Sequence, residues 1–278
     1  MSDFSRYMIV TDLDGTFLSR ESTVVERNMR ALRGFLAHGG LFTVATGRVH
    51  INIRSAFEPS LYLSAPAVLC NGAYLYDFST DTAMFEQLLS ARDAADILHF
   101  VKSRFPDMLF RVSALDSLRI EAVKGLLEHD VPKYDEGSVK VCAAESWSLD
   151  DWFKITFREE REVLDEFRAA FVAHFGDRFA VNDSATRIFE AQAPQCSKAA
   201  GLNKLRKLAS IDGDITVIAC GDFENDIQML RAADYAVAPA NAHPSVKAIA
   251  DRVMCDCDQG LIADVIAAIE MGQFPLKG

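Results

Sequence analysis

The sequence has 278 residues, of which half are apolar and a quarter charged, and its formal net charge at pH 7 is -11. This acidic balance disfavours nucleic acids and anionic membrane surfaces as partners, because both attract clustered lysine and arginine. The apolar runs are far shorter than the roughly 20 residues that span a bilayer. We therefore expect a folded, cytoplasmic protein with no membrane segment, no export signal and no obligate protein partner.

The 6 cysteines are scattered along the chain, a pattern that favours reduced thiols over disulfides. Cys255 and Cys257 form a C-x-C pair, but no further soft ligands lie at a spacing suited to zinc. We interpret both as core or strand-end thiols.

The first third of the chain alternates strands and helices. An apolar, β-branched-rich run predicts a buried parallel strand at Tyr7–Thr11, and further strands are predicted at Leu41–Ala45 and Ala67–Cys70. In the helix after the first strand, Thr23 and Glu26 have capping-box spacing, and a second helix is predicted over residues 49–57. Polar residues follow each strand. The carboxyl ends of parallel strands share one edge of the sheet, so the pattern predicts one anion-binding pocket there.

A chain of this length favours two domains, and its pattern changes twice. Residues 84–189 combine helices and strands at a different spacing and predict an α+β insertion. The strand-helix alternation then returns with a helix at Lys198–Leu208 and a strand at Ile215–Cys220. We predict a discontinuous α/β core over residues 1–83 and 190–278, built on a parallel sheet and interrupted by the insertion.

Two acids follow the first strand in the segment Asp12-Leu13-Asp14-Gly15-Thr16. At a spacing of two, the carboxylates of Asp12 and Asp14 can project to the same side of the chain. One carboxylate can attack phosphorus and form an acyl phosphate, while the other protonates the leaving oxygen and later deprotonates water. Gly15 permits the tight turn, and the Thr16 hydroxyl can donate a hydrogen bond.

Attack by one anion on another requires neutralisation of charge, and Mg²⁺ bound by a few carboxylates usually provides it in phosphoryl transfer. Asp222 and Asp226 are the further acids available, at the junction of a strand and a helix whose N-terminus favours anions. Asn225 lies between them. Lys198, at the start of a helix, and Thr46 can hold phosphate oxygens.

The motifs differ in how specific they are. Asp-x-Asp-Gly-Thr arises by chance about once in 10^5 positions. Thr46-Gly47-Arg48 is more often a helix cap, Asn71-Gly72 an ordinary turn, and a single lysine such as Lys198 a solvated side chain. Their order along the chain, each at the end of a strand or helix, favours one common site.

These motifs together resemble the haloacid dehalogenase superfamily of phosphohydrolases, and in particular its Cof-like type IIB branch with a large C2-type cap. The resemblance covers essentially the whole chain. It implies a Rossmann-like core with an inserted α+β cap domain that sets substrate specificity. It also implies Mg²⁺ as the cofactor and an aspartyl-phosphate intermediate.

The resemblance further implies a role for each site residue. Asp12 is expected to be the nucleophile and Asp14 the general acid and base, with Thr46 and Lys198 as phosphate ligands. The metal ligands implied are Asp12, the backbone carbonyl of Asp14, and Asp222. Asp226 is expected to support the metal ligands without binding the ion itself, and Asn225 to lie near metal and phosphate. The residues expected to shape the substrate pocket are Gly47, Arg48 and Asn71.

The chain also departs from its relatives. Phe223 stands where they often have serine after Gly-Asp, Ala240 precedes Asn241 where glycine is common, and Lys198 is followed by alanines instead of glycine. No charged group is lost, so these departures affect the expected substrate more than the reaction class.

We expect a phosphatase acting on small phosphorylated metabolites, with sugar phosphates foremost. A phosphohexomutase-like phosphotransferase would return the phosphoryl group to a sugar instead of water. A protein that binds phosphometabolites without turnover is the third alternative, but clustered carboxylates would repel phosphate in the absence of a metal.

Overall fold

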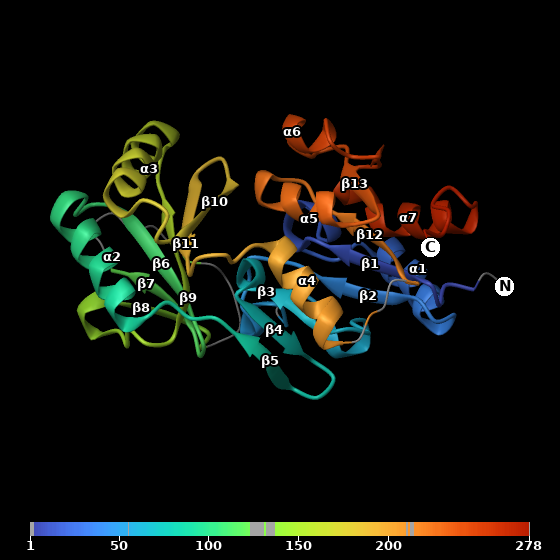
Figure 1. The fold of residues 1–278 in the computed structure, drawn as a ribbon, viewed down its shortest axis with the longest axis horizontal. Coiled ribbons are helices and arrows are strands. Elements are labelled where there is room, and N and C mark those ends of the chain that lie inside the picture. Colours follow the sequence, from blue (N-terminus) through green and yellow to red (C-terminus); the bar gives the residue numbers. More distant parts are fainter. Residues whose placement is uncertain are drawn as a thin grey trace. The chain divides into compact units, whose positions relative to one another are not determined.

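The computed structural model describes residues 3–54, 56–122, 131, 137–209, 211 and 214–277. The chain divides into two compact units (Figure 1). Unit 1 comprises Met1–Gly47, Ala56–Phe85 and Ser197–Gly278, and unit 2 comprises Arg48–Ser55 and Glu86–Cys196. The core and cap boundaries expected from the sequence remain a prediction.

Unit 1 contains a five-stranded sheet in the order β14-β13-β12-β1-β2, in which every neighbouring pair is parallel. The strands are β1 (Tyr7–Thr11), β2 (Leu41–Val44), β12 (Thr216–Cys220), β13 (Tyr235–Pro239) and β14 (Arg252–Met254). The first and last thirds of the chain therefore share one sheet. This confirms the predicted α/β fold with a parallel sheet.

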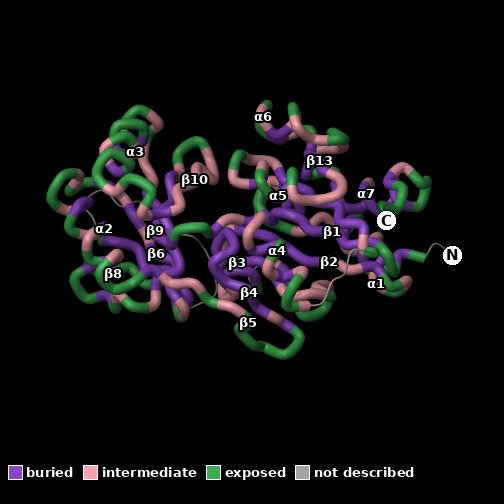
Figure 2. Tube along the Cα trace, in the orientation of Figure 1, coloured by how far each residue is buried: buried purple, intermediate pink, exposed green. Residues whose placement is uncertain are grey.

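Helices cover both faces of this sheet. Met8 and Val10 of β1 share a core with α4 (Lys198–Leu208) and α5 (Ile227–Ala232). Ile9 alternates with them and is also fully buried. The remaining helices of unit 1 are α1 (Glu26–Ala37), α6 (Pro244–Lys247) and α7 (Leu261–Glu270), and α1 packs against α7. Figure 2 shows β1 and β2 buried, as a parallel sheet requires.

A second, three-stranded sheet in unit 1 has the order β3-β4-β5. Its strands are β3 (Ala67–Leu69), β4 (Tyr74–Asp77) and β5 (Thr82–Glu86). A parallel bridge between Ala45 and Val68 joins β3 to the end of β2. The turn after β3 therefore lies beside the turn after β2.

Unit 2 contains a six-stranded sheet in the order β10-β11-β9-β6-β7-β8, mostly antiparallel with one parallel pair, β7 and β8. The strands are β6 (Leu109–Ala114), β7 (Leu118–Glu121), β8 (Val139–Cys142), β9 (Trp152–Arg158), β10 (Ala180–Ala185) and β11 (Ile188–Gln192). Phe171 of helix α3 (Arg161–Phe175) packs on Phe157 of β9 and Phe189 of β11, and it also contacts Phe100 of helix α2 (Ala91–Arg104).

The opposite face of the same sheet is polar. Lys154 and Thr156 of β9 pair with Gln192 and Glu190 of β11, and Ser113 of β6 pairs with Lys154. Paired residues share a face of the sheet, and all five are buried. Lys154 forms an ion pair with Glu190, which also accepts a hydrogen bond from Thr156 (3.2 Å).

Two local predictions are wrong. Helix α1 starts at Glu26 after Val25, without a side-chain cap, because the Thr23 hydroxyl bonds with that of Ser19 (2.9 Å) instead. In the predicted helix over 49–57, the described residues form only a 3₁₀ turn at His50–Asn52. There the Arg48 guanidinium donates to the Asn52 carbonyl (3.2 Å), an acceptor that a longer helix would use.

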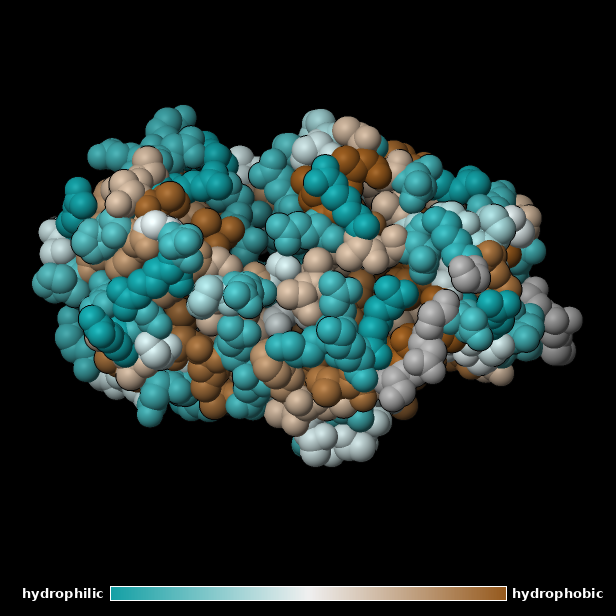
Figure 3. All heavy atoms as spheres, viewed as in Figure 1, coloured by the Kyte–Doolittle hydropathy of each residue, from teal (hydrophilic) through white to brown (hydrophobic). Residues whose placement is uncertain are grey.

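On the face shown in Figure 3, hydrophilic residues cover most of the coloured surface, with hydrophobic ones between them. Within the described part of the chain, every helix is too short or too polar to cross a membrane.

Gly72 allows the turn after β3 to reach the start of α4. Its φ is +88°, and a Cβ atom there would lie 2.0 Å from the Ser197 carbonyl oxygen. Gly201 meets it from the helix, since a Cβ at Gly201 would lie 2.8 Å from the Gly72 Cα. The two glycines therefore bring the β3 turn and the N-terminus of α4 into backbone contact.

We expect Gly72→Ala to lower the free energy of unfolding by about 3 kcal/mol or more, because left-handed strain adds to a backbone clash. Gly272→Ala is the matched control: its φ is +67°, but nothing lies within 4 Å of the added Cβ. It should lose only about 1 to 2 kcal/mol. Urea denaturation followed by circular dichroism measures both, and equal losses would contradict the close approach.

Candidate active site

The acids lie at the carboxyl ends of the central strands. β1 pairs in parallel with β12 on one side and β2 on the other. The Asp12 amide donates to the Cys220 carbonyl (2.9 Å), and the Ala45 amide donates to the Thr11 carbonyl (2.8 Å). The hydrogen bonds between the parallel strands therefore continue to the strand ends. Asp12, Asp222 and Thr46 follow these ends and lie at the same edge of the sheet.

The loop after β1 is a tight turn over Leu13–Phe17 that packs against Asp222. Gly15 has a φ of +78°, and a Cβ there would lie 2.6 Å from Asp222 Oδ2. The Thr16 hydroxyl donates to Asp222 Oδ1 (2.8 Å). The predicted need for glycine at this turn therefore has two causes, its left-handed backbone and the closeness of a carboxylate.

Lys198 joins two of the acids. It begins α4, whose first turn is capped by the Ser197 hydroxyl accepting from the Ala200 amide (3.1 Å). The Lys198 ammonium donates to Asp12 Oδ1 (2.6 Å) and to Asp226 Oδ1 (2.7 Å). Its side chain is only 1% exposed. A buried cation thus lies between two carboxylates from opposite ends of the chain.

Asp226 holds the backbone that carries Asp222. Its Oδ2 accepts from the amides of Asp222 (3.0 Å) and Phe223 (3.1 Å), while its Oδ1 accepts from Lys198. Gly221 makes this possible, because a Cβ there would lie 2.5 Å from the Asp226 Cβ. Both oxygens of Asp226 therefore serve to fix its neighbours.

Burial and crowding shift the ionisation of these groups. Burial raises the pKa of Asp12 well above its ordinary value; Lys198 opposes this shift, and the nearby carboxylates add to it. Burial, followed by the Asp226 carboxylate, raises the pKa of Asp222 to about 6. Burial alone would lower the pKa of Lys198, but Asp12 and Asp226 outweigh it and raise it overall. The negative charge of the clustered carboxylates therefore exceeds what the single ammonium of Lys198 compensates.

The donor set fits a hard divalent cation. Asp12, Asp222 and Asp226 each place an oxygen within 4.8 Å of the others. All these donors are carboxylate oxygens, which Mg²⁺ prefers. The raised pKa values of Asp12 and Asp222 agree with this, because burial and neighbouring carboxylates crowd negative charge that a bound cation would relieve.

The structure brings the predicted phosphate-binding turns together within unit 1. The Thr46 carbonyl accepts from the Asn71 amide (3.0 Å), and both residues are buried. Asn71 adopts a left-handed backbone with a φ of 51°. Gly47 follows Thr46 and is half-buried. Through Gly72, this pair of turns also contacts the start of the helix that carries Lys198.

Three further predicted residues have the following places. Asp14 is exposed, and its charge adds to the raised pKa of Asp12 and of Asp222. Asn225 is half-buried in the 3₁₀ turn Glu224–Asp226. Arg48 belongs to unit 2, where its guanidinium donates to Asn52.

Sequence reasoning missed the close-contact glycines Gly72, Gly201 and Gly221. Each lies within three residues of a predicted site residue, but glycine next to a polar residue is also an ordinary turn signal. Only the packing of distant segments distinguishes these uses.

The sequence profile of the haloacid dehalogenase-like hydrolases matches residues 9–266 of the chain. The chain belongs to this family. The match includes all the site residues discussed above, and it confirms the resemblance seen in the motifs.

Proteins similar to this chain match it over nearly its whole length. The phosphatase YwpJ of Bacillus subtilis (strain 168) is 28% identical, covering 93% of this chain and 98% of YwpJ. The pyridoxal phosphate phosphatase YbhA of Escherichia coli (strain K12) is 27% identical, covering 93% and 97%. A solved HAD/COF-like hydrolase from Plasmodium vivax has a TM-score of 0.82 at 21% identity and covers 96% of each chain, which shows a shared fold.

We expect Lys198→Met to lower the free energy of unfolding by about 3 to 5 kcal/mol, because it leaves two buried carboxylates without their cation. Lys207→Met, on the exposed last turn of the same helix, is the control and should change it by less than about 0.5 kcal/mol. Urea denaturation in metal-free buffer measures both variants. Similar losses would show that Lys198 does not hold the acids together.

The raised pKa of Asp222 predicts a stability difference that depends on pH. In metal-free buffer, wild type should lose stability as pH rises from about 4 through about 6, because the folded protein holds a proton that the unfolded chain releases. Asp222→Asn never gains that charge. Its stability advantage should therefore grow across this window, to about 1 to 3 kcal/mol above pH 7.

Thermal denaturation at a series of pH values with EDTA measures this difference, and the same series with excess Mg²⁺ is the control. Mg²⁺ should stabilise wild type more than Asp222→Asn. A constant difference across the pH range would contradict the raised pKa.

Proposed function

We propose that this haloacid dehalogenase-like hydrolase is a Mg²⁺-dependent phosphatase that hydrolyses small phosphorylated metabolites, such as sugar phosphates, through an aspartyl-phosphate on Asp12. The observation that carries the proposal is the buried contact of Lys198 with both Asp12 and Asp226. It places a cation beside a carboxylate at the end of β1. That pairing suits a nucleophile that must approach a phosphate anion.

In the first step, an Asp12 carboxylate oxygen attacks phosphorus, and the bond from phosphorus to the leaving oxygen breaks. Asp14 donates its proton to that oxygen, so the product leaves as an alcohol. In the second step, Asp14 takes a proton from water, whose oxygen attacks phosphorus and releases Asp12 and inorganic phosphate. The exposure of Asp14 supports this role, because it must exchange protons with water in each cycle.

Lys198 and Thr46 would hold the phosphate oxygens in this scheme. Lys198 is oriented by two acids, so its ammonium is fixed before substrate binds. Asn71, Gly47, Arg48 and Asn225 complete the proposed binding residues.

Asp12, the Asp14 carbonyl and Asp222 would hold the Mg²⁺, which neutralises charge on the phosphate when bound. Asp226 would support them without binding the ion. This division is supported by its hydrogen bonds, since both Asp226 oxygens already accept from Lys198 or from backbone amides.

One observation supports a small phosphorylated metabolite as substrate. YbhA, which is similar along almost its whole length, is a pyridoxal phosphate phosphatase. The proposed location is the cytoplasm.

We expect Asp12→Asn to lower kcat for Mg²⁺-dependent hydrolysis of p-nitrophenyl phosphate by roughly 10^3-fold or more, because an amide cannot form the acyl phosphate. Release of inorganic phosphate is the measurement. Asp264→Asn, which removes a carboxylate paired with Arg27 elsewhere in unit 1, is the control and should keep wild-type activity. Substantial turnover by Asp12→Asn would exclude the covalent mechanism.

A further inference from the structure

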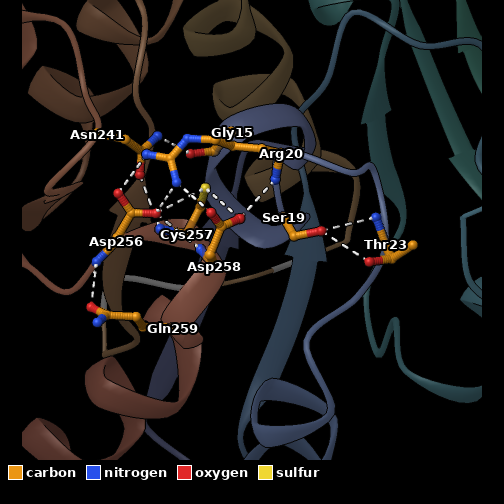
Figure 4. A network of polar contacts seen from close by, with 9 residues as sticks. All are labelled: Gly15, Ser19, Arg20, Thr23, Asn241, Asp256, Cys257, Asp258 and Gln259. Atoms are coloured by element: carbon orange, nitrogen blue, oxygen red, sulfur yellow. Dashed lines mark hydrogen bonds and ion pairs between the residues drawn. The ribbon is translucent and has the colours of Figure 1, made fainter.

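The segment after β13 contacts both loops that carry the acids. The side-chain amide of Asn241 donates to the Gly15 carbonyl (2.7 Å), as Figure 4 shows. Two residues on, the His243 backbone amide donates to the Asp222 carbonyl (2.8 Å). The segment Pro239–His243 therefore connects the loop of Asp12 with the loop of Asp222.

Asn241 is itself held in place. Its Oδ1 accepts from the Cys257 backbone amide (3.0 Å), while its Nδ2 faces the Gly15 carbonyl. A reversed amide would place oxygen against oxygen and nitrogen against an N–H, so these two partners fix its orientation. The neighbouring Ala240 amide donates to the Cys255 carbonyl (3.2 Å), which anchors the same segment. Asn241 is thus a rigid connection rather than a surface side chain.

Gly15 has little room to move beside the Asp222 carboxylate. A Cβ there would lie 2.6 Å from Asp222 Oδ2, and the adjacent Thr16 hydroxyl donates to the other oxygen of the same carboxylate. A displacement of the Gly15 carbonyl would therefore change how the β1 loop meets Asp222. A displacement of about 1 Å can lower a catalytic rate by about 10²-fold.

We propose that Asn241 is a positioning residue that fixes the Asp12–Asp14 loop against Asp222. Its effect on catalysis rests on the function proposed above, whereas its effect on the loop does not. Asn241 acts through the Gly15 carbonyl and needs no contact with substrate.

A second connection to the β1 loop provides a matched control. The Arg20 guanidinium pairs with Asp256 (2.6 Å) and with Asp258, which flank Cys257 (Figure 4). The Arg20 side chain is 57% exposed, and exposed ion pairs contribute little to stability. It joins the outer end of the β1 loop to the same 3₁₀ turn, Cys257–Gln259, without contacting Gly15. Removing the Arg20 ion pairs therefore tests the loss of a connection to the β1 loop while the hydrogen bond from Asn241 to the Gly15 carbonyl stays in place.

Asn241→Leu removes both hydrogen bonds at similar size, and Arg20→Met removes the ion pairs. With p-nitrophenyl phosphate and Mg²⁺, Asn241→Leu should lower kcat by about 10- to 100-fold and change KM by less than about 2-fold. Arg20→Met should keep kcat within about 2-fold. Asn241→Asp, which keeps the acceptor for Cys257 but not the donor for Gly15, should also lose kcat, and it remains available if the leucine variant does not fold.

Hydrogen exchange measured by mass spectrometry gives a readout that does not need activity. In Asn241→Leu, exchange should accelerate at the amides of Phe17 and Leu18, which close the β1 turn onto Asp12 and Leu13. In Arg20→Met, faster exchange should be limited to the outer loop and residues 256–259.

Each outcome decides between the two proposals. Wild-type kcat in a folded Asn241→Leu, an effect on KM alone, or an equal loss of kcat in Arg20→Met would overturn the role of Asn241. An inactive wild type would instead exclude the proposed function. The positioning role would then depend on the exchange data, and unchanged exchange at Phe17 and Leu18 would refute it.

Discussion

The site depends on one buried contact, the Lys198 ammonium between Asp12 and Asp226. Burying a charge is unfavourable unless partners compensate it, and here the three groups compensate one another only together. Asp226 in turn fixes the amides of Asp222 and Phe223. The position of Asp222 therefore follows from the position of Lys198.

This arrangement requires segments that are distant in sequence to approach at backbone distance. Glycine provides that approach at Gly15 and Gly72, where a Cβ would overlap the Asp222 carboxylate and the Ser197 carbonyl. Gly221 allows a close local contact with Asp226. The close packing that these glycines allow also desolvates the acids, which raises the pKa values of Asp12 and Asp222. The same packing that assembles the site thus creates its need for a cation.

The sequence alone indicated the parallel sheet and the residues at its edge, because strand patterns and polar strand ends are local signals. The predicted bounds of β1 and α4 agree with the structure. The prediction of a helix over 49–57 was wrong. There the Arg48 guanidinium donates to the Asn52 carbonyl, which a longer helix would use, and sequence periodicity does not reveal this contact. The contacts of Lys198 and Asn241 could not be predicted either, since each joins segments far apart in the chain. The catalytic roles remain a proposal.

The contact between Asp12 and Lys198 also bears on how the chain is made. The two residues are 186 positions apart, so a ribosome adding 5 to 20 residues per second needs roughly 10 to 40 s between them. The pairing edge of β1 that later receives β12 has no native partner during that time, and exposed strand edges invite wrong pairing. The strands and helices of unit 2 are all synthesised within this interval. Nascent chains should therefore be prone to mispairing at this edge until β12 emerges.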